Sequence, residues 1–216
     1  MKIQRYRIVF SKTEAMRFTG HLDLILTWER TFRRAALPLA YSEGFNPRPV
    51  INLASPLPLG FISSSEIGDF WLSECIKKEE VQESLERSLP PGLIIHHVKE
   101  IIQIHGKKLP ALVERSEFTV SLSKAYTDLD LKIDTLLQSS KVIRTRKGKE
   151  YDLRPLIHDI TFDMGQEDYP SLLNIILFSL PTGTGRPDEV LAALDIPHHE
   201  ALICRTAIVL NSAEET

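Results

Sequence analysis

Residues 5–10 read RYRIVF, and residues 21–36 read HLDLILTWERTFRRAA. In the first segment every second residue is apolar, which predicts a strand with one shared face formed by Tyr6, Ile8 and Phe10. In the second segment Trp28 and Phe32 recur at a helical spacing, and the chain reaches Pro38 soon afterwards. We therefore expect a strand followed by an amphipathic helix that ends before Pro38.

The remainder of the first half continues this pattern. Strand-like segments lie at residues 50–54, 67–72 and 93–98, and a helical stripe with charged flanks lies at 81–89. Between the first two of these strands, the segment PLPLGFISSS (residues 56–65) is rich in Pro, Gly and Ser and is expected to be irregular. The predicted order of elements in the first half is βαββαβ.

The second half repeats that order. Strands are expected at 118–122, 157–162, 172–180 and 202–210, and helices at 129–137 and 186–194. One addition is a basic hairpin at residues 141–154, with its turn at Lys147-Gly148. A repeated βαββαβ order predicts an α+β protein of two tandem ferredoxin-like modules, residues 1–108 and 109–216, with the boundary inside residues 106–114.

Composition limits where the protein works. The N-terminal residues lack the apolar core of a secretion signal, and the longest apolar run, residues 172–180, is far shorter than the ~20 residues of a membrane helix. We expect a cytoplasmic protein without a membrane span, disordered only at the tail, residues 211–216. The two cysteines, Cys75 and Cys204, are interpreted as buried thiols that act as small hydrophobic residues.

Charge is distributed unevenly along the chain. The net charge is -3, yet residues 1–50 contain nine Lys and Arg residues against four Asp and Glu residues. A second excess lies in residues 141–154, where six basic residues accompany Glu150 and Asp152. Two basic segments on an acidic chain indicate a surface that binds anions.

The candidate binding residues follow these two segments. Arg30, Arg33 and Arg34 have helical spacing and share a face opposite Trp28 and Phe32. Beside them lies a proline-rich loop that could present Phe45 to a base, although the same arginines could pair with acids and Phe45 could lie in the core. The full candidate set is Arg17, His21, Asp23, Arg30, Arg33, Arg34, Phe45, Asn46 and Arg48, extended by Arg144, Arg146 and Lys147.

Several phrases resemble one bacterial family. They are HLDL (21–24), RTFRRAALPLAYSEGFNPRP (30–49), SPLPLG (55–60), DLRPLI (152–157) and GRPDEVL (185–191). Proteins with these phrases belong to an uncharacterised group of radical-SAM-associated proteins, which are fused to or encoded beside a radical SAM enzyme. The resemblance implies a radical SAM protein as partner. This chain has only two cysteines, whereas a radical SAM cluster needs three close together, so it implies the associated protein and not the catalyst.

Three functional hypotheses follow. The leading one is an accessory protein that recognises the substrate of a radical SAM enzyme and binds structured RNA such as tRNA or rRNA. The second is a metal-independent endoribonuclease in which His21 acts as general acid or base. The third is a protein-only adaptor that docks the radical SAM subunit through residues 42–49. No metal-binding motif occurs, so we expect no metal, and we expect no cofactor. Whether the chain has catalytic activity of its own is left open, with His21 as the one candidate and the accessory role favoured.

Overall fold

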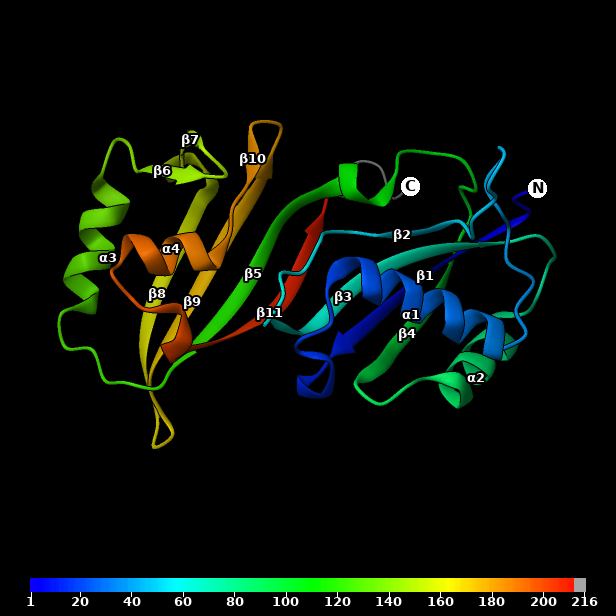
Figure 1. Cartoon of the computed structure of the whole chain (residues 1–216), viewed down its shortest axis with the longest axis horizontal. Coiled ribbons are helices and arrows are strands. Elements are labelled where there is room, and N and C mark those ends of the chain that lie inside the picture. The colour runs from blue at the N-terminus through cyan, green and yellow to red at the C-terminus, as the bar shows by residue number, and fades with distance from the viewer. Residues whose placement is uncertain (212–216) are drawn as a thin grey trace. The chain divides into compact units, whose positions relative to one another are not determined.

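The computed structural model describes residues 1–211, so the tail from residue 212, expected to be disordered, lies outside the described residues. Within residues 1–211 the protein has an α+β fold with four α-helices and a nine-stranded β-sheet, and two further strands form a separate hairpin. The predicted α+β class is confirmed. The chain divides into two compact units, Met1–Val113 and Glu114–Asn211 (Figure 1).

The first unit contains the elements that the hydrophobic patterns predicted. They are β1 (Gln4–Lys12), α1 (His21–Arg34), β2 (Ile51–Leu53), β3 (Ile62–Leu72), α2 (Lys78–Ser88) and β4 (Leu93–Ile101). Two short 3-10 helices, η1 (Glu14–Met16) and η2 (Leu109–Leu112), accompany them. The strands are ordered β4-β1-β3-β2, and each neighbouring pair is antiparallel.

The core of this unit lies between one face of the sheet and helices α1 and α2 (Figure 1). Trp28 stacks on Phe32 with ring centroids 5.4 Å apart, and Phe10 meets the Trp28 ring edge to face at 4.8 Å. All three side chains are fully buried. The predicted stripe of α1 is therefore confirmed as the face that packs on β1, where burial of each large aromatic side chain contributes a few kcal/mol.

The opposite face of the same sheet carries a buried ion-pair network. Asp69 on β3 accepts hydrogen bonds from both Arg5 and Arg7 on β1, including Nε of Arg5 at 3.1 Å and Nε of Arg7 at 2.8 Å. The chain after β4 crosses this face, because Arg5 Nη1 donates to the carbonyl of Gln103 and Trp71 Nε1 donates to that of Ile104. The guanidinium groups are thus buried although they share no face with the aromatic core.

Two details of the first unit differ from the sequence expectations. Strand β3 begins at Ile62, whereas the prediction placed residues 62–65 in an irregular connection. The longer strand forms because β1 extends to Lys12, which pairs with Ser63. Cys75 is exposed, not buried, because β3 ends at Leu72 and the Ser73 N–H turns to the carbonyl of Pro38.

The second unit has a similar succession of elements. They are β5 (Val113–Leu122), α3 (Leu129–Gln138), β6 (Ile143–Arg146), β7 (Lys149–Asp152), β8 (Ile157–Gln166), β9 (Tyr169–Leu180), β10 (Gly183–Thr184), α4 (Pro187–Ala193) and β11 (Ala201–Leu210). Short 3-10 helices η3 (Arg154–Leu156) and η4 (His198–Glu200) precede β8 and β11. The main strand order is β11-β5-β9-β8, with β10 also paired to β9.

Helix α4, expected at residues 186–194, begins with Pro187 and has Asp188 and Glu189 in its first turn, where their charges complement the helix dipole. Its buried residues Val190 and Leu191 pack inward, as do Leu129, Ile133 and Leu136 of α3. Cys204 is only half-buried, because it alternates along β11 with the buried residues Ile203 and Arg205. The expectation of two buried thiols is therefore wrong for both cysteines.

Candidate functional site

The proline-rich loop after α1 is anchored to the sheet at its base. Leu39 forms an isolated bridge to Leu72 of β3, and Tyr41 forms one to Pro49 on the returning strand. The Ala40 N–H donates to the carbonyl of Trp71 at 2.8 Å, and the Val50 N–H returns to the carbonyl of Ala40 at 2.9 Å. The loop therefore leaves and rejoins the fold at one fixed place.

The tip of this loop is closed by its own hydrogen bonds. The Ser42 N–H donates to the carbonyl of Arg48 at 2.8 Å, and the Arg48 N–H donates to the Ser42 hydroxyl at 3.0 Å. Gly44 has φ of 126°, a conformation that L side chains rarely adopt. Phe45 follows with an exposed fraction of 101%. The alternative that placed Phe45 in the core is therefore wrong.

Helix α1 directs its three candidate arginines away from the core. Arg30, Arg33 and Arg34 are all exposed. Arg33 makes a long ion pair with Glu29, with 3.8 Å between the charged atoms. Arg34 donates to the carbonyl of Ser88 at 2.8 Å and thereby supplies a partner for the last turn of α2. Arg34 thus has a structural contact, while Arg30 and Arg33 extend into solvent.

Arg17, His21 and Asp23 lie at the other end of α1. Arg17 Nε donates to the carbonyl of Gly60 at 2.9 Å, and its guanidinium lies 5.5 Å from the centre of the Phe18 ring. His21 is the half-buried first residue of the helix, and Asp23 is an exposed acid in the first turn. His21 and Asp23 thus lie about two turns of α1 or more before Arg30, and Arg17 precedes the helix.

The basic hairpin β6–β7 belongs to the second unit, as predicted, and turns at Lys147 and Gly148, which have φ of 49° and 75°. Arg144 Nε lies 3.3 Å from Glu189 Oε2 at the start of α4. Burial, together with the nearby Glu189 carboxylate, raises the pKa of Tyr151 to about 12. Glu189 therefore holds the hairpin through two side chains, while Arg146 and Lys147 are exposed.

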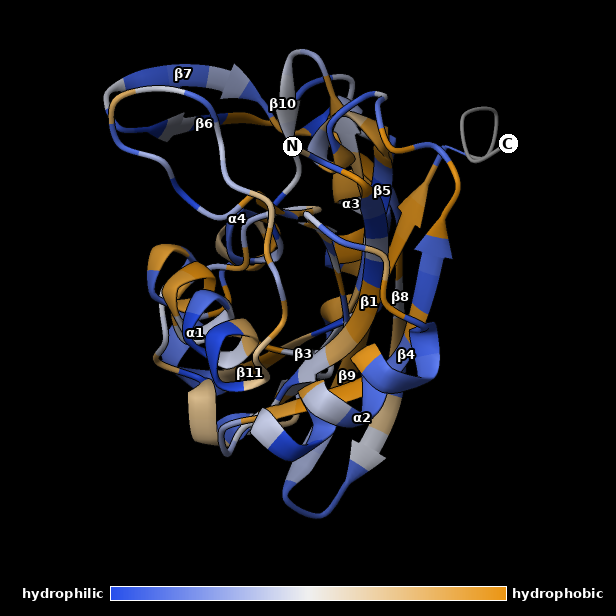
Figure 2. Cartoon of the chain, turned by 90° about the vertical axis from the view of Figure 1, so that its right-hand side faces the viewer, coloured by the Kyte–Doolittle hydropathy of each residue, from blue (hydrophilic) through white to orange (hydrophobic). Residues whose placement is uncertain are grey.

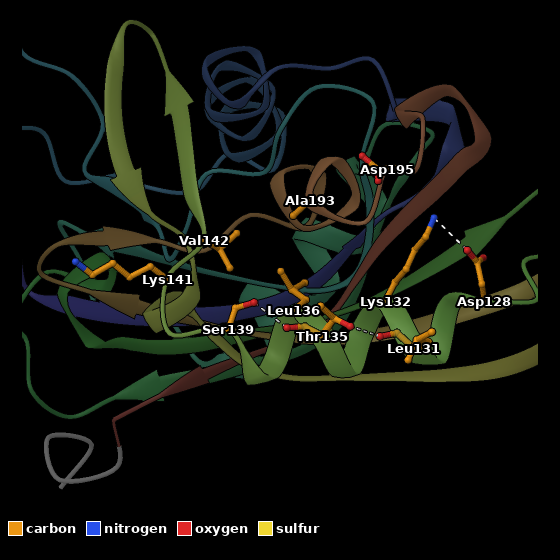
Figure 3. A pocket seen from close by; sticks show the side chains of 10 residues that line it. All are labelled: Asp128, Leu131, Lys132, Thr135, Leu136, Ser139, Lys141, Val142, Ala193 and Asp195. Carbon is orange, nitrogen blue, oxygen red and sulfur yellow. Dashed lines mark hydrogen bonds and ion pairs between the residues drawn. The ribbon is translucent and has the colours of Figure 1, made fainter.

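A groove of about 520 Å³ lies beside α3 in the second unit (Figure 3). Its lining mixes apolar residues such as Leu136 and Val142 with charged ones. Lys132 pairs with Asp128 at 3.4 Å near one end, and Lys141 lies at the other end, pointing away from that pair. None of the predicted binding residues lines this groove.

Two features of the structure were not found from the sequence. One is an exposed apolar row on the first unit, formed by Phe18, Leu22, Leu26 and Leu59. Its signal was the spacing of four from Phe18 to Leu22 to Leu26, away from the Trp28 stripe. The other is a cluster in the second unit in which Glu200 accepts hydrogen bonds from Lys124 at 2.6 Å and from the Tyr126 hydroxyl at 2.8 Å.

Across residues 1–211, no three His, Cys, Asp or Glu side chains are grouped so that they could hold a metal ion. The helices in the same range are too short or too polar to cross a bilayer. His96 contacts Ser11 at 2.6 Å, and its neighbour His97 is exposed. The candidate site is therefore the surface around α1 and the Phe45 loop, with a separate basic hairpin in the other unit.

Comparison with known proteins shows the family. Residues 5–186 match the family described as "Uncharacterized protein conserved in bacteria (DUF2344)", and the chain belongs to that family. None of the curated proteins matches the chain significantly.

Among solved structures, the chain is similar to one in a Cbf5-Nop10-Gar1 complex, with 10% identity and a TM-score of 0.49. That match covers 94% of this chain and 48% of the other, so the chain spans about half the length of that structure. The acetolactate synthase small subunit of Thermotoga maritima matches with 13% identity and a TM-score of 0.28, over 96% of this chain and 95% of the other.

Proposed function

We propose that this member of the DUF2344 family is an RNA-recognition protein that assists a radical SAM enzyme, with structured RNA such as tRNA or rRNA as its ligand. The observation that carries the proposal is the wholly exposed Phe45 at the tip of a loop closed by Ser42 and Arg48. An aromatic ring with no neighbours on either face is free to stack on an unpaired base, an interaction that contributes about 1–3 kcal/mol per base.

The loop geometry supports this role for Phe45. A flexible loop would lose conformational entropy on binding, whereas the Ser42–Arg48 hydrogen bonds and Pro47 restrict the tip beforehand. Asn46 is exposed next to the ring and has both a donor and an acceptor for a base edge. Arg48 is exposed on the returning side of the loop and is available to a phosphate.

Exposed arginines supply the electrostatic part of the proposal. Arg30 and Arg33 are exposed on α1, and the ion pair of Arg33 with Glu29 is long, at 3.8 Å. When exposed guanidinium groups bind phosphates, the RNA releases the counterions that those phosphates held, and this release makes the affinity depend on salt concentration. In the other unit, Arg146 and Lys147 at the hairpin tip are exposed and available to RNA phosphates, and Arg144 positions the hairpin through Glu189.

The strand orders β4-β1-β3-β2 and β11-β5-β9-β8 support our inference that both units are ferredoxin-like modules. The radical SAM partner is inferred from the family resemblance of the YSEGFNPRP phrase at residues 41–49. A radical SAM cluster needs three cysteine thiolates, and this chain has only Cys75 and Cys204. The radical chemistry therefore belongs to the partner, and this chain contributes recognition.

The test is fluorescence anisotropy with fluorescein-labelled bulk tRNA at two salt concentrations. We expect Phe45→Ala to weaken binding by about 5- to 100-fold at both concentrations, because stacking is not ionic. Arg30→Ala/Arg33→Ala is expected to weaken binding at low salt. It is also expected to reduce the slope of log affinity against log salt concentration by about one to two, because each arginine neutralises about one phosphate. Ile102→Ala is the matched control, since Ile102 is 98% exposed on the same unit. Absence of binding at low salt, or equal binding by Phe45→Ala and wild type, would overturn the proposal.

A further inference from the structure

Four large apolar side chains are exposed together at the beginning of α1. Their exposed fractions are 76% for Phe18, 74% for Leu22, 44% for Leu26 and 61% for Leu59. Leu22 and Leu26 are one helical turn apart on α1, and Phe18 lies in the turn that leads into the helix, before the extended residue Gly20. We call these four residues the α1 apolar row.

Leu59 joins the row through the backbone of its neighbour. The Gly60 N–H donates to the carbonyl of Arg17 at 3.0 Å, and Arg17 Nε donates back to the carbonyl of Gly60 at 2.9 Å. These reciprocal bonds hold the segment of Leu59 against the segment of Phe18, although 41 positions separate the two residues in the numbering. The row is thus drawn from two hydrogen-bonded segments of the first unit.

A buried lysine joins the two segments that carry the row. The buried side chain of Lys12 donates from Nζ to the carbonyl of Arg17 at 3.2 Å and to that of Phe61 at 2.9 Å. Lys12 therefore ties together the two segments that carry Phe18 and Leu59. A surface that is already ordered loses little entropy when it binds a partner.

The row does not serve the folding of α1. The helix buries a different face, formed by Leu24, Trp28 and Phe32, against the sheet. In Figure 2 hydrophobic and hydrophilic residues both appear around the turns of α1, as expected for a helix with apolar residues outside its core face. A contiguous apolar surface of this kind on a folded protein marks a site of interaction.

The charges beside the row indicate what covers it. Helical geometry places the exposed residues Arg30 and Arg33 further along the face of Leu22 and Leu26. At the other end of the row, the Arg17 guanidinium lies over the Phe18 ring. Asp23 is an exposed acid on the flank, in the first turn of α1, where the helix dipole offsets a negative charge. The row thus has Arg17 at one end and Arg30 and Arg33 at the other, where Glu29 lies 3.8 Å from Arg33 and Arg30 adds a further positive charge.

We propose that the α1 apolar row docks an amphipathic helix of a partner protein, with leucine-type anchors three or four residues apart and carboxylates at both ends. From Leu22 to Arg33 the face is roughly 16 Å long, which matches about three turns of a helix. Three members of the row are leucines, which offer no planar surface for base stacking, and the Phe18 ring already carries the Arg17 guanidinium 5.5 Å from its centre, so the row favours protein over RNA. This inference rests on the accessory role proposed above and assigns it a protein-docking surface that excludes the Phe45 tip but shares Arg30 and Arg33 with the proposed RNA surface.

The test uses a labelled model peptide with Leu at helical positions i, i+4 and i+7 and Glu at both ends, and a matched peptide with Lys in place of Glu. Fluorescence anisotropy is expected to show binding of the acidic peptide to the wild-type protein and at least about tenfold weaker binding of the basic one. Leu22→Ser/Leu26→Ser is expected to weaken acidic-peptide binding by about tenfold or more. Leu131→Ser, a 71% exposed leucine of α3, is the control and should bind like wild type.

The same variants separate this inference from RNA recognition. Leu22→Ser/Leu26→Ser should bind tRNA like wild type, and Phe45→Ala should bind the acidic peptide like wild type. Equal binding of the two peptides, or undiminished binding by Leu22→Ser/Leu26→Ser, would overturn the docking proposal while leaving the RNA result unaffected. A wild-type dimer in sedimentation velocity that Leu22→Ser/Leu26→Ser converts to monomer would also overturn it and assign the row to a second copy of the chain.

Discussion

Ser42 and Arg48 hold each other in a reciprocal arrangement, in which each residue's backbone N–H donates to an oxygen of the other. One acceptor is the Arg48 carbonyl and the other is the Ser42 hydroxyl. Because only the second bond uses a side chain, the contribution of loop closure can be tested without removing Phe45.

Ser42→Ala is expected to weaken tRNA binding by about three- to tenfold, because the loop tip must then be ordered on binding. The free energy of unfolding should change by less than about 1 kcal/mol, since the residue is exposed. Anisotropy and urea denaturation measure the two effects. Ser140→Ala, an exposed serine of the second unit, is the control. Unchanged affinity for Ser42→Ala would show that loop closure does not prepare the site.

Asp69→Asn is expected to destabilise the protein by about 3–5 kcal/mol, because two buried guanidinium groups would lose their counter-charge. The lost free energy is measurable from the urea midpoint. Asp134→Asn changes an exposed acid of α3 and should leave the midpoint unaltered. A midpoint for Asp69→Asn close to that of the control would mean that the Arg5 and Arg7 charges are stabilised elsewhere.

The cluster around Glu200 predicts two pH effects on stability. Hydrogen bonds from Lys124, and to a smaller extent from Tyr126, lower the pKa of Glu200 in the folded protein. The ionised Glu200 therefore stabilises the folded state above the unfolded-state pKa of about 4.3, and this stabilisation is lost as the pH falls below that value. Burial, with the hydrogen bond to Glu200, raises the pKa of Tyr126 to about 12. The contribution of neutral Tyr126 to the free energy of unfolding is therefore fully present below about pH 10 and is lost between about pH 10 and 12.

Melting temperatures measured across pH check both effects. Tyr126→Phe should reduce the alkaline loss, to which Tyr6 and Tyr151 also contribute because their pKa values are likewise raised to about 12. Glu200→Gln should reduce the acid loss and lower stability at neutral pH. Tyr169→Phe, at the beginning of β9, is the control for general effects of a tyrosine substitution. If Tyr126→Phe and wild type lose stability equally between pH 10 and 12, the Tyr126–Glu200 hydrogen bond does not contribute as described.

Glu189→Gln is expected to loosen the β6–β7 hairpin, because Arg144 would lose its ion pair and Tyr151 its charged neighbour. Trypsin should then cut near Arg146 and Lys149 about three- to tenfold faster than in wild type, since cleavage follows local opening. Glu150→Gln, within the hairpin itself, is the control. Equal cleavage rates would show that the hairpin is held mainly by the bonds from Val142 to Asp152 and Leu153.

Local patterns predicted much of the fold because their physical cause is local. The Trp28 and Phe32 spacing specified the buried face of α1, and Lys147-Gly148 specified the hairpin turn through its need for positive φ. The exposure of Phe45 was left open by the sequence, since an aromatic residue in a loop fits either a core or a surface. It was settled by the position of the loop base on Leu72 and Trp71 of β3.

Contacts between distant residues account for what the sequence did not predict. The burial of Arg5 and Arg7 depends on Asp69 and on the crossing chain at Gln103. The exposure of Cys75 depends on where β3 ends, and the apolar row depends on a hydrogen-bonded pair of segments at Arg17 and Gly60.

The sequence by itself determined the order of elements, the aromatic core of α1, the basic hairpin and the cationic candidates, because side-chain periodicity and turn chemistry act over a few residues. Only the tertiary structure decided which candidates extend into solvent and which bind the backbone, as Arg34 does at Ser88 and Arg17 at Gly60. It also decided that four large apolar side chains in two hydrogen-bonded segments are exposed, namely Phe18, Leu22, Leu26 and Leu59. The physical reason is that burial and pairing are set by the packing of segments far apart in the chain, which no local pattern encodes.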